Sequence, residues 1–299
     1  MERKLCRLEL VACLLLSAVC IVRMCQAATT IDVANPYAYA ANTGWINARG
    51  DETNGAVIGQ FVCSGYLYGA NVGWISLGNG APTNGVRYGN ASADDCGVNN
   101  DGLGNLYGYA YGANIGWINF ETNYGKPKVD LLTGNLGGYV WSANAGWISL
   151  SNAQAFVKTD TMDAGPDTDG DGIPDQWELA HASSLTTFTA SGDFDGDKVP
   201  DKSEYASDTD PADAAKYMKI TSYAATGGVN GVVTWLSEPT RVYRLEAAST
   251  ASNEAPWSDV VGSLIPPSPP PATETTKGFT DSTATQRFYR VKAVPPLSP

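Results

Sequence analysis

Aromatic residues alternate with small or polar residues in four similar segments of the first half of the chain. The segments read YAYAANTGWINA, YLYGANVGWISL, YAYGANIGWINF and YVWSANAGWISL, and begin at Tyr37, Tyr66, Tyr109 and Tyr139. Alternation on both sides of an Ala-Asn-x-Gly turn predicts a β-hairpin in each copy. Because a lone hairpin cannot bury its apolar face in water, the copies predict a β-repeat array, a barrel or a sandwich.

The second strand of each hairpin distinguishes the two faces of the sheet. One face carries the apolar positions Ile75, Leu77, Ile118, Phe120, Ile148 and Leu150, which we expect in the core. The other face carries the tryptophans of the repeats, Trp45, Trp74, Trp117 and Trp147, and in each of these last three strands the tryptophan shares it with a serine or asparagine. The tryptophans are therefore expected to be partly exposed. They could form cross-strand pairs with tyrosines, worth about 0.2–1 kcal/mol, or serve as platforms for sugar rings.

A regular series of acidic residues follows the repeats, in the segment DTDGDGIPDQWE. It matches the twelve-residue calcium loop, in which oxygen ligands recur at fixed positions and a glycine makes the turn. Gly172 occupies the turn position. The predicted ligands are the side chains of Asp167, Asp169, Asp171, Asp175 and Glu178 and the carbonyl of Ile173. A calcium ion needs six to eight oxygens, so this spacing predicts a site for one ion.

A second copy of the loop begins at Asp193. Its predicted ligands are the side chains of Asp193, Asp195, Asp197, Asp201 and Glu204 and the carbonyl of Val199. Lys198 replaces the turn glycine, which requires a left-handed backbone and brings a positive charge towards the ion. We therefore expect the second loop to bind calcium more weakly.

The flanks of the loops favour a rigid connector over a calcium sensor. A sensor needs a helix on each side of its loop, whereas Gly165 and Pro166 rule out an incoming helix before the first loop. Only a short helix from Gln176 to about Ala182 is predicted after it. Pro174 and Pro200 also remove the backbone donor through which paired loops would join.

The segments DTDGDGIPD, DFDGDKVPD and SDTDP resemble thrombospondin type 3 repeats and the related dockerin-like, EF-hand-like calcium loops of modular bacterial secreted proteins. The resemblance covers about residues 160–213. It implies a calcium-stiffened connector with an adhesion-type role, and it implies Asp208 and Asp210 as possible further ligands. The last part of the chain, which ends in an RFYRV strand, resembles the small C-terminal β-sandwich that follows such loops.

The charge of the chain divides in the same way as its pattern. Fifteen acidic and two basic residues lie in residues 160–213, whereas residues 28–159 and 214–299 are close to neutral. This distribution gives no electrostatic footprint for nucleic acid. We predict a mainly β protein with a hairpin-repeat domain (28–159), a calcium-binding connector with short helices (160–213) and a small β-sandwich (214–299).

The first 27 residues predict a secretory signal peptide, because basic residues precede an apolar run from Leu8 to Val22. The expected location is extracellular or at the cell surface, with no integral membrane segment after cleavage. Cleavage leaves Cys63 and Cys96, and two cysteines in an oxidising compartment predict one disulfide.

The side chains provide few means of catalysis. The chain contains one histidine, His181, so it cannot assemble a histidine-based triad or a multi-histidine metal site. We therefore expect a secreted, non-enzymatic, calcium-binding protein of structural or adhesion type. Its expected partner is a cell-envelope polysaccharide or a surface protein. The alternative interpretation is a carbohydrate-binding module that uses the repeated tryptophans.

Overall fold

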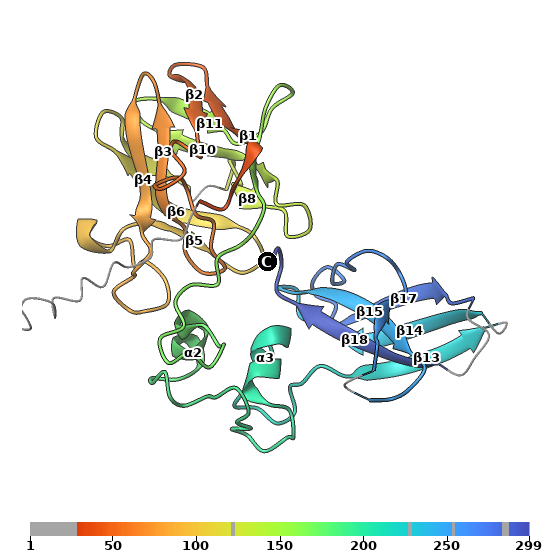
Figure 1. Cartoon of the computed structure of the whole chain (residues 1–299). Coiled ribbons are helices and arrows are strands. Elements are labelled where there is room, and N and C mark those ends of the chain that lie inside the picture. The colour runs from red at the N-terminus through yellow and green to blue at the C-terminus, as the bar shows by residue number, and fades with distance from the viewer. Residues whose placement is uncertain (1–28, 121–122, 227–228, 253–254, 283–286, 299) are drawn as a thin grey trace, which may run out of the picture.

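The computed structural model describes residues 29–120, 123–226, 229–252, 255–282 and 287–298. The predicted signal peptide lies outside these residues. The protein is mainly β, with antiparallel sheets, and its two α-helices in the described residues lie between the β domains (Figure 1). No helix in the described part of the chain is long and apolar enough to cross a membrane.

The four repeats form hairpins that close into one antiparallel barrel of eight strands. The hairpins are β1 (Ile31–Ala40) with β2 (Gly44–Asn47), β3 (Ser64–Gly69) with β4 (Gly73–Asn79), β6 (Leu106–Gly112) with β7 (Gly116–Asn119), and β10 (Tyr139–Ser142) with β11 (Gly146–Ser149). Each hairpin pairs with the next, and β11 pairs with β1 through Tyr39–Ser149 and Ala40–Ile148. Among the three predicted architectures, the structure is the barrel.

Every second residue of the barrel strands points into the barrel, and these side chains fill its interior. Small residues such as Ala38, Ala40 and Ala110 point inward from the first strands, and isoleucines such as Ile46 and Ile118 point inward from the second strands. All of these are at most 2 % exposed. A small barrel needs this mixture of small and large residues to fill its tapering interior. The expected core face and the partly exposed tryptophans are therefore confirmed.

Asparagines of the turns join neighbouring hairpins into a ring. In each case the side-chain Nδ2 donates to a carbonyl oxygen in the turn of the preceding hairpin: Asn42 to Ala145 (3.2 Å), Asn71 to Thr43 (3.0 Å), Asn114 to Val72 (3.1 Å) and Asn144 to Ile115 (3.1 Å). The first of these bonds connects the first hairpin to the last. The repeated asparagine thus serves barrel closure in addition to the turn itself.

Short elements cover the rest of the barrel domain. They are the 3-10 turn η1 (Ala93–Asp95), β5 (Val98–Asn100), which pairs with β6, the two-stranded pair β8 (Lys128–Val129) and β9 (Leu136–Gly137), and β12 (Val157–Thr159), which pairs with β1.

The predicted disulfide is wrong, because both cysteines are free thiols. Cys63 is fully buried in the hydrophobic core of the barrel domain, and this burial raises its pKa to about 12. The Sγ atom of Cys96 contacts Asn90 Oδ1 at 3.2 Å. The segment between β4 and β6, which contains Cys96, is instead anchored by Tyr88, whose hydroxyl accepts a hydrogen bond from Gly80 N and donates one to Cys63 O.

The C-terminal region consists of two three-stranded antiparallel sheets. One contains β13 (Ile220–Thr226), β14 (Asn230–Leu236) and β17 (Glu274–Thr280), and the other contains β16 (Ser258–Asp259), β15 (Val242–Ala248) and β18 (Phe288–Val294). Their shared core includes Val233, Trp235, Tyr243 and Leu245, all of them fully buried. After β18 the chain returns to the barrel domain, where Leu297 packs against its core and its carbonyl accepts from Met162 N.

Candidate metal centre

The first acidic loop folds so that three aspartates converge. Asp167, Asp169 and Asp171 each bring a carboxylate oxygen within 4.8 Å of the others. Hydrogen bonds to these carboxylates shape the loop: Asp167 accepts from Gly170 N through one oxygen and from Gly172 N through the other, and Asp171 Oδ1 accepts from Ile173 N at 2.8 Å. Asp171 Oδ2 is buried without a hydrogen-bond partner. The loop therefore collects negative oxygen atoms around one point, as a hard cation requires.

Glu178 completes the first loop from helix α2 (Asp175–His181), where the sequence predicted a short helix. Its side chain is fully buried, and neither carboxylate oxygen has a hydrogen-bond partner. Burial, followed by the nearby charges of Asp169 and Asp171, raises the pKa of Glu178 to about 7. A buried and unpaired carboxylate is costly unless a cation or a donor compensates it. This carboxylate can supply the bidentate ligand of a calcium loop.

The second loop repeats this arrangement. Asp193, Asp195 and Asp197 bring carboxylate oxygens within 4.8 Å of one another. Buried oxygens without a partner recur on Asp195, Asp197 and Glu204, the last of which lies on helix α3 (Asp201–Ser207). Burial and the charges of Asp195 and Asp197 raise the pKa of Glu204 to about 7. Glu204 differs from Glu178 in that its Oε1 accepts from Thr209 Oγ1 at 3.3 Å.

The fourth predicted aspartate ligand of each loop, Asp175 in the first and Asp201 in the second, forms hydrogen bonds that hold the loop closed. Asp175 accepts from the backbone N (2.7 Å) and the hydroxyl (2.5 Å) of Thr168. Asp201 accepts from Phe194 N and from Thr189 N, each at 2.9 Å. Both oxygens of each carboxylate thus accept hydrogen bonds from the chain, as both oxygens of Asp167 and of Asp193 also do; unlike those two, Asp175 and Asp201 do not join the converging clusters. At the predicted carbonyl ligands, Ile173 and Val199, the backbone N–H donates to the aspartate two residues earlier.

Two lysines lie in or next to the acidic loops and have different roles. Lys198 has a φ of 80°, which is the left-handed conformation expected where a turn glycine is replaced. Lys202, on α3, donates from Nζ to the carbonyl of Asp171 at 3.2 Å, so the second loop's helix contacts the first loop. The ammonium group of Lys202 thus lies at the first acidic loop, where it binds a backbone carbonyl and not one of the converging carboxylates.

The helices of the two loops share a small hydrophobic core. It consists of Ile173, Trp177, Phe188 and Tyr205, with Phe61 of the barrel domain packed against it. Tyr205 also donates its hydroxyl to Gln60 Oε1 of the barrel domain at 3.4 Å. His181 contacts the carbonyl of Trp177 through Nδ1 and packs on its ring, which is a structural role. The loops are thus attached to the barrel through side chains that immediately precede or follow the glutamates.

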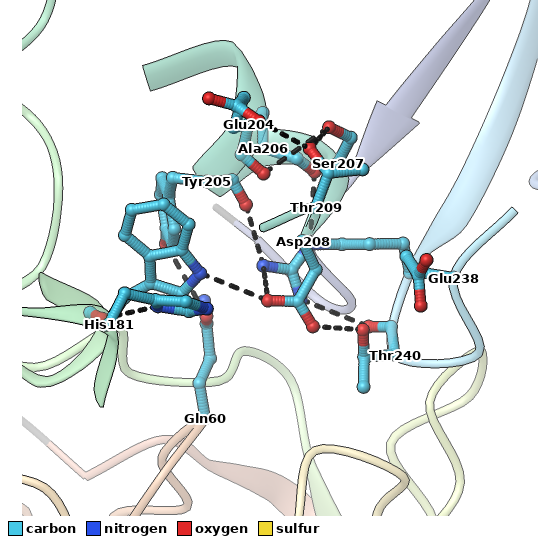
Figure 2. A network of polar contacts seen from close by, with 12 residues as sticks. Gln60, His181, Glu204, Tyr205, Ala206, Ser207, Asp208, Thr209, Glu238 and Thr240 are labelled. Atoms are coloured by element: carbon cyan, nitrogen blue, oxygen red, sulfur yellow. Dashed lines mark hydrogen bonds and ion pairs between the residues drawn. The ribbon is translucent and has the colours of Figure 1, made fainter. Parts of the chain in front are cut away.

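Asp208, implied as a further ligand by the resemblance, has a different role (Figure 2). It accepts hydrogen bonds from Trp177 Nε1 at 3.1 Å and from the hydroxyl of Thr240, and it pairs with Arg241 at 3.3 Å. The Arg241 guanidinium also donates to the carbonyls of Tyr205 (2.7 Å) and Ala206 (3.0 Å) at the end of α3. This network, here called the latch, joins the connector to the sandwich. Nothing in the sequence around Arg241 distinguishes it from the other arginines of the sandwich.

Comparisons with known proteins supply no relative: no family model, no curated protein and no solved structure matches the chain. The chemistry of the site therefore rests on its geometry. Two clusters of converging carboxylates, each backed by a buried glutamate, can bind hard divalent cations through oxygen ligands alone.

Proposed function

We propose that this is a secreted or cell-surface calcium-binding protein of structural or adhesion type, in which calcium stiffens the connector between a barrel domain and a β-sandwich. The resident ions are two calcium ions, one in each acidic loop. Asp167, Asp169, Asp171, Glu178 and the carbonyl of Ile173 hold the first, and Asp193, Asp195, Asp197, Glu204 and the carbonyl of Val199 hold the second. The protein is assigned no reaction.

The observation that carries this proposal is the burial of carboxylate oxygens without partners in both loops, at the third predicted aspartate (Asp171 and Asp197) and at the glutamate (Glu178 and Glu204). Glu178 and Glu204 are both 0 % exposed, and Asp171, Asp195 and Asp197 each leave one oxygen buried and unpaired. Folded proteins rarely bury polar atoms in this way unless a ligand or ion satisfies them. Calcium suits the site better than zinc, because all of the converging ligand atoms are oxygens and none is nitrogen or sulfur.

Calcium also supports the mechanical role. Fifteen acidic residues within residues 160–213 repel one another at neutral pH. Two calcium ions would bring four positive charges to the acidic loops, beside Trp177 and Tyr205, which anchor the connector to the barrel and to the latch. A connector that is firm with calcium and looser without it follows from these contacts.

Calorimetric titration of residues 28–299 with CaCl₂, after chelation and dialysis, tests the proposal. We expect two binding events, the weaker belonging to the second loop because of Lys198. Glu178→Gln should remove or weaken one event and Glu204→Gln the other. The control Glu274→Gln changes an exposed glutamate of the sandwich and should leave both events intact. A titration without heat, together with a melting temperature that calcium does not raise, would refute the proposal.

A further inference from the structure

The outer surface of the barrel is covered by aromatic rings at equivalent positions of the four hairpins. We call this surface the aromatic belt. It consists of Tyr37, Tyr39, Trp45, Tyr66, Tyr68, Trp74, Tyr109, Tyr111, Trp117, Tyr139, Trp141 and Trp147. Because the barrel is closed, the belt passes around the whole domain.

Each hairpin presents its three rings in nearly the same geometry. In the second hairpin, the ring of Trp74 lies 4.9 Å from that of Tyr68, its cross-strand neighbour, and 6.2 Å from that of Tyr66. The other three hairpins repeat these distances within a few tenths of an ångström. The rings within a triad meet at steep angles, an arrangement that aromatic pairs favour.

Packing within the triads does not bury the rings. The four tryptophans remain 44–48 % exposed, whereas the isoleucines that follow them are at most 3 % exposed. The barrel core therefore consists of the inward-facing residues, and the tryptophans stabilise it only through cross-strand contacts. Large apolar surfaces that stay open to water usually mark an interaction site.

The belt carries no charge. Opposite the first tyrosine of each triad lies Asn47, Ser76, Asn119 or Ser149, so that within the repeats the rings alternate with uncharged hydrogen-bonding groups. This neutrality contrasts with a formal charge of −12 for the chain. We propose that the aromatic belt binds a neutral polysaccharide, with the apolar faces of sugar rings against the aromatic rings and with sugar hydroxyls near the amide and hydroxyl groups.

The repetition of the triads favours a repeating ligand over a protein partner. A protein interface is one patch with a central cluster of anchor residues and a polar rim. The barrel instead offers four equivalent triads on a convex surface. Four weak and equivalent sites suit a polymer of identical units, whose binding to one site raises its effective concentration at the others. Such avidity can exceed the affinity of a single site by about 10²–10⁴-fold.

Pull-down and affinity electrophoresis of residues 28–299 with neutral glycans test this inference. The probes are cellulose, chitin, amylose and a β-1,3-glucan, with anionic alginate for comparison. We expect retention by at least one neutral glycan and weaker retention by alginate. The double variant Trp74→Ala and Trp117→Ala should lose about tenfold or more in affinity, because truncating aromatic anchors typically has effects of this size. The matched control Tyr124→Ala removes a ring that is 90 % exposed but lies outside the belt.

Further measurements separate the alternatives. If the alanine variant unfolds, Trp74→Phe with Trp117→Phe keeps a ring in each triad while reducing its area, and a several-fold loss of affinity is still expected. Unchanged affinity in a folded belt variant, or no binding to any of the neutral glycans, overturns the inference. Sedimentation tests for self-association. If the parent chain self-associates and Trp74→Ala does not, the belt binds a second copy of the chain and the inference is overturned. Calcium titration of the same samples tests the acidic loops separately, so that a failure of glycan binding can be told apart from a failure of calcium binding.

Discussion

At the scale of single residues, Glu178 and Glu204 hold the least compensated charges of the described chain. Both carboxylates are fully buried, and the pKa of each is raised to about 7 by burial and by neighbouring aspartates. Above pH 7 in the absence of calcium, each carries a charge with few or no donors. With calcium bound, the same charge is matched by the ion. A single substitution should therefore have opposite effects on stability in the two conditions.

Glu178→Gln tests this reversal at pH 8. In chelator we expect the variant to melt a few degrees above the parent, since the cost of burying a neutral amide is lower than that of an unpaired carboxylate. In millimolar calcium we expect the order to reverse, because the variant lacks the bidentate ligand and gains less from binding. Differential scanning fluorimetry in both buffers measures the effect. A variant that is less stable in chelator yet keeps the full calcium-induced increase would contradict the assignment of Glu178 as a ligand.

Lys198 gives a second prediction at this scale. A non-glycine residue at a φ of 80° is strained by about 1–2 kcal/mol, whereas glycine accepts this conformation but loses more entropy on folding. Lys198→Gly should therefore stabilise the protein by up to about 1 kcal/mol and tighten the second calcium site. Gly172→Ala in the first loop should do the opposite, since φ there is 87° and its Cβ would lie 2.0 Å from Lys202 Nζ. Urea unfolding and calcium titration of both variants check the two signs.

At the scale of elements, the asparagine ring links hairpins that are distant in sequence. Asn71→Ala removes one donor and leaves the carbonyl of Thr43 without it, so we expect a loss of about 1 kcal/mol in the free energy of unfolding. Asn71→Asp should cost at least as much, since a carboxylate keeps the shape but cannot donate. Asn123→Ala, at an exposed position outside the turns of the four repeats, is the control. Equal urea midpoints for Asn71→Ala and the control would show that the ring adds nothing to stability.

The elements also show how far sequence reasoning reaches. The hairpins, the core face and the helix beginning near Gln176 follow from local periodicity and turn residues, and the structure confirms them. The loop spacing placed the first three aspartates of each loop together, because spacing within twelve residues is local information, but the fourth, Asp175 or Asp201, binds backbone and hydroxyl donors instead. Closure through β1 and β11 depends on contacts about 110 residues apart, which no local pattern encodes. The disulfide was wrongly predicted for the same reason: Cys63 is buried in a core that forms only when the barrel closes, and the local sequence does not show this.

At the scale of the whole molecule, the connector contacts both β domains, the barrel through Tyr205 and the sandwich through Asp208. Chelation should leave both β domains folded, because their cores contain no residue of the acidic loops. It should loosen residues 160–213, which we expect to become sensitive to protease while the scattering radius of gyration increases. Limited proteolysis with mass mapping, with and without calcium, measures this change. Cleavage sites that are the same in both conditions would count against a stiffening role for calcium.

The latch makes a further prediction that separates domain posture from domain stability. Arg241 is 5 % exposed and uses one guanidinium to bind Asp208 and the two carbonyls at the end of α3. Lysine cannot reproduce this fork, so Arg241→Lys should leave at least one of these acceptors unpaired at a cost of about 1–3 kcal/mol. Because these hydrogen bonds join the connector to the sandwich, the cost should appear as freer domain motion, measured by X-ray scattering in calcium. Arg244→Lys is the matched control, because Arg244 lies three residues further along, on β15, and pairs with Asp259 at the surface. If Arg241→Lys lowered the melting temperature of the sandwich without changing the scattering profile, Arg241 would belong to the sandwich core and the latch would not set the posture of the domains.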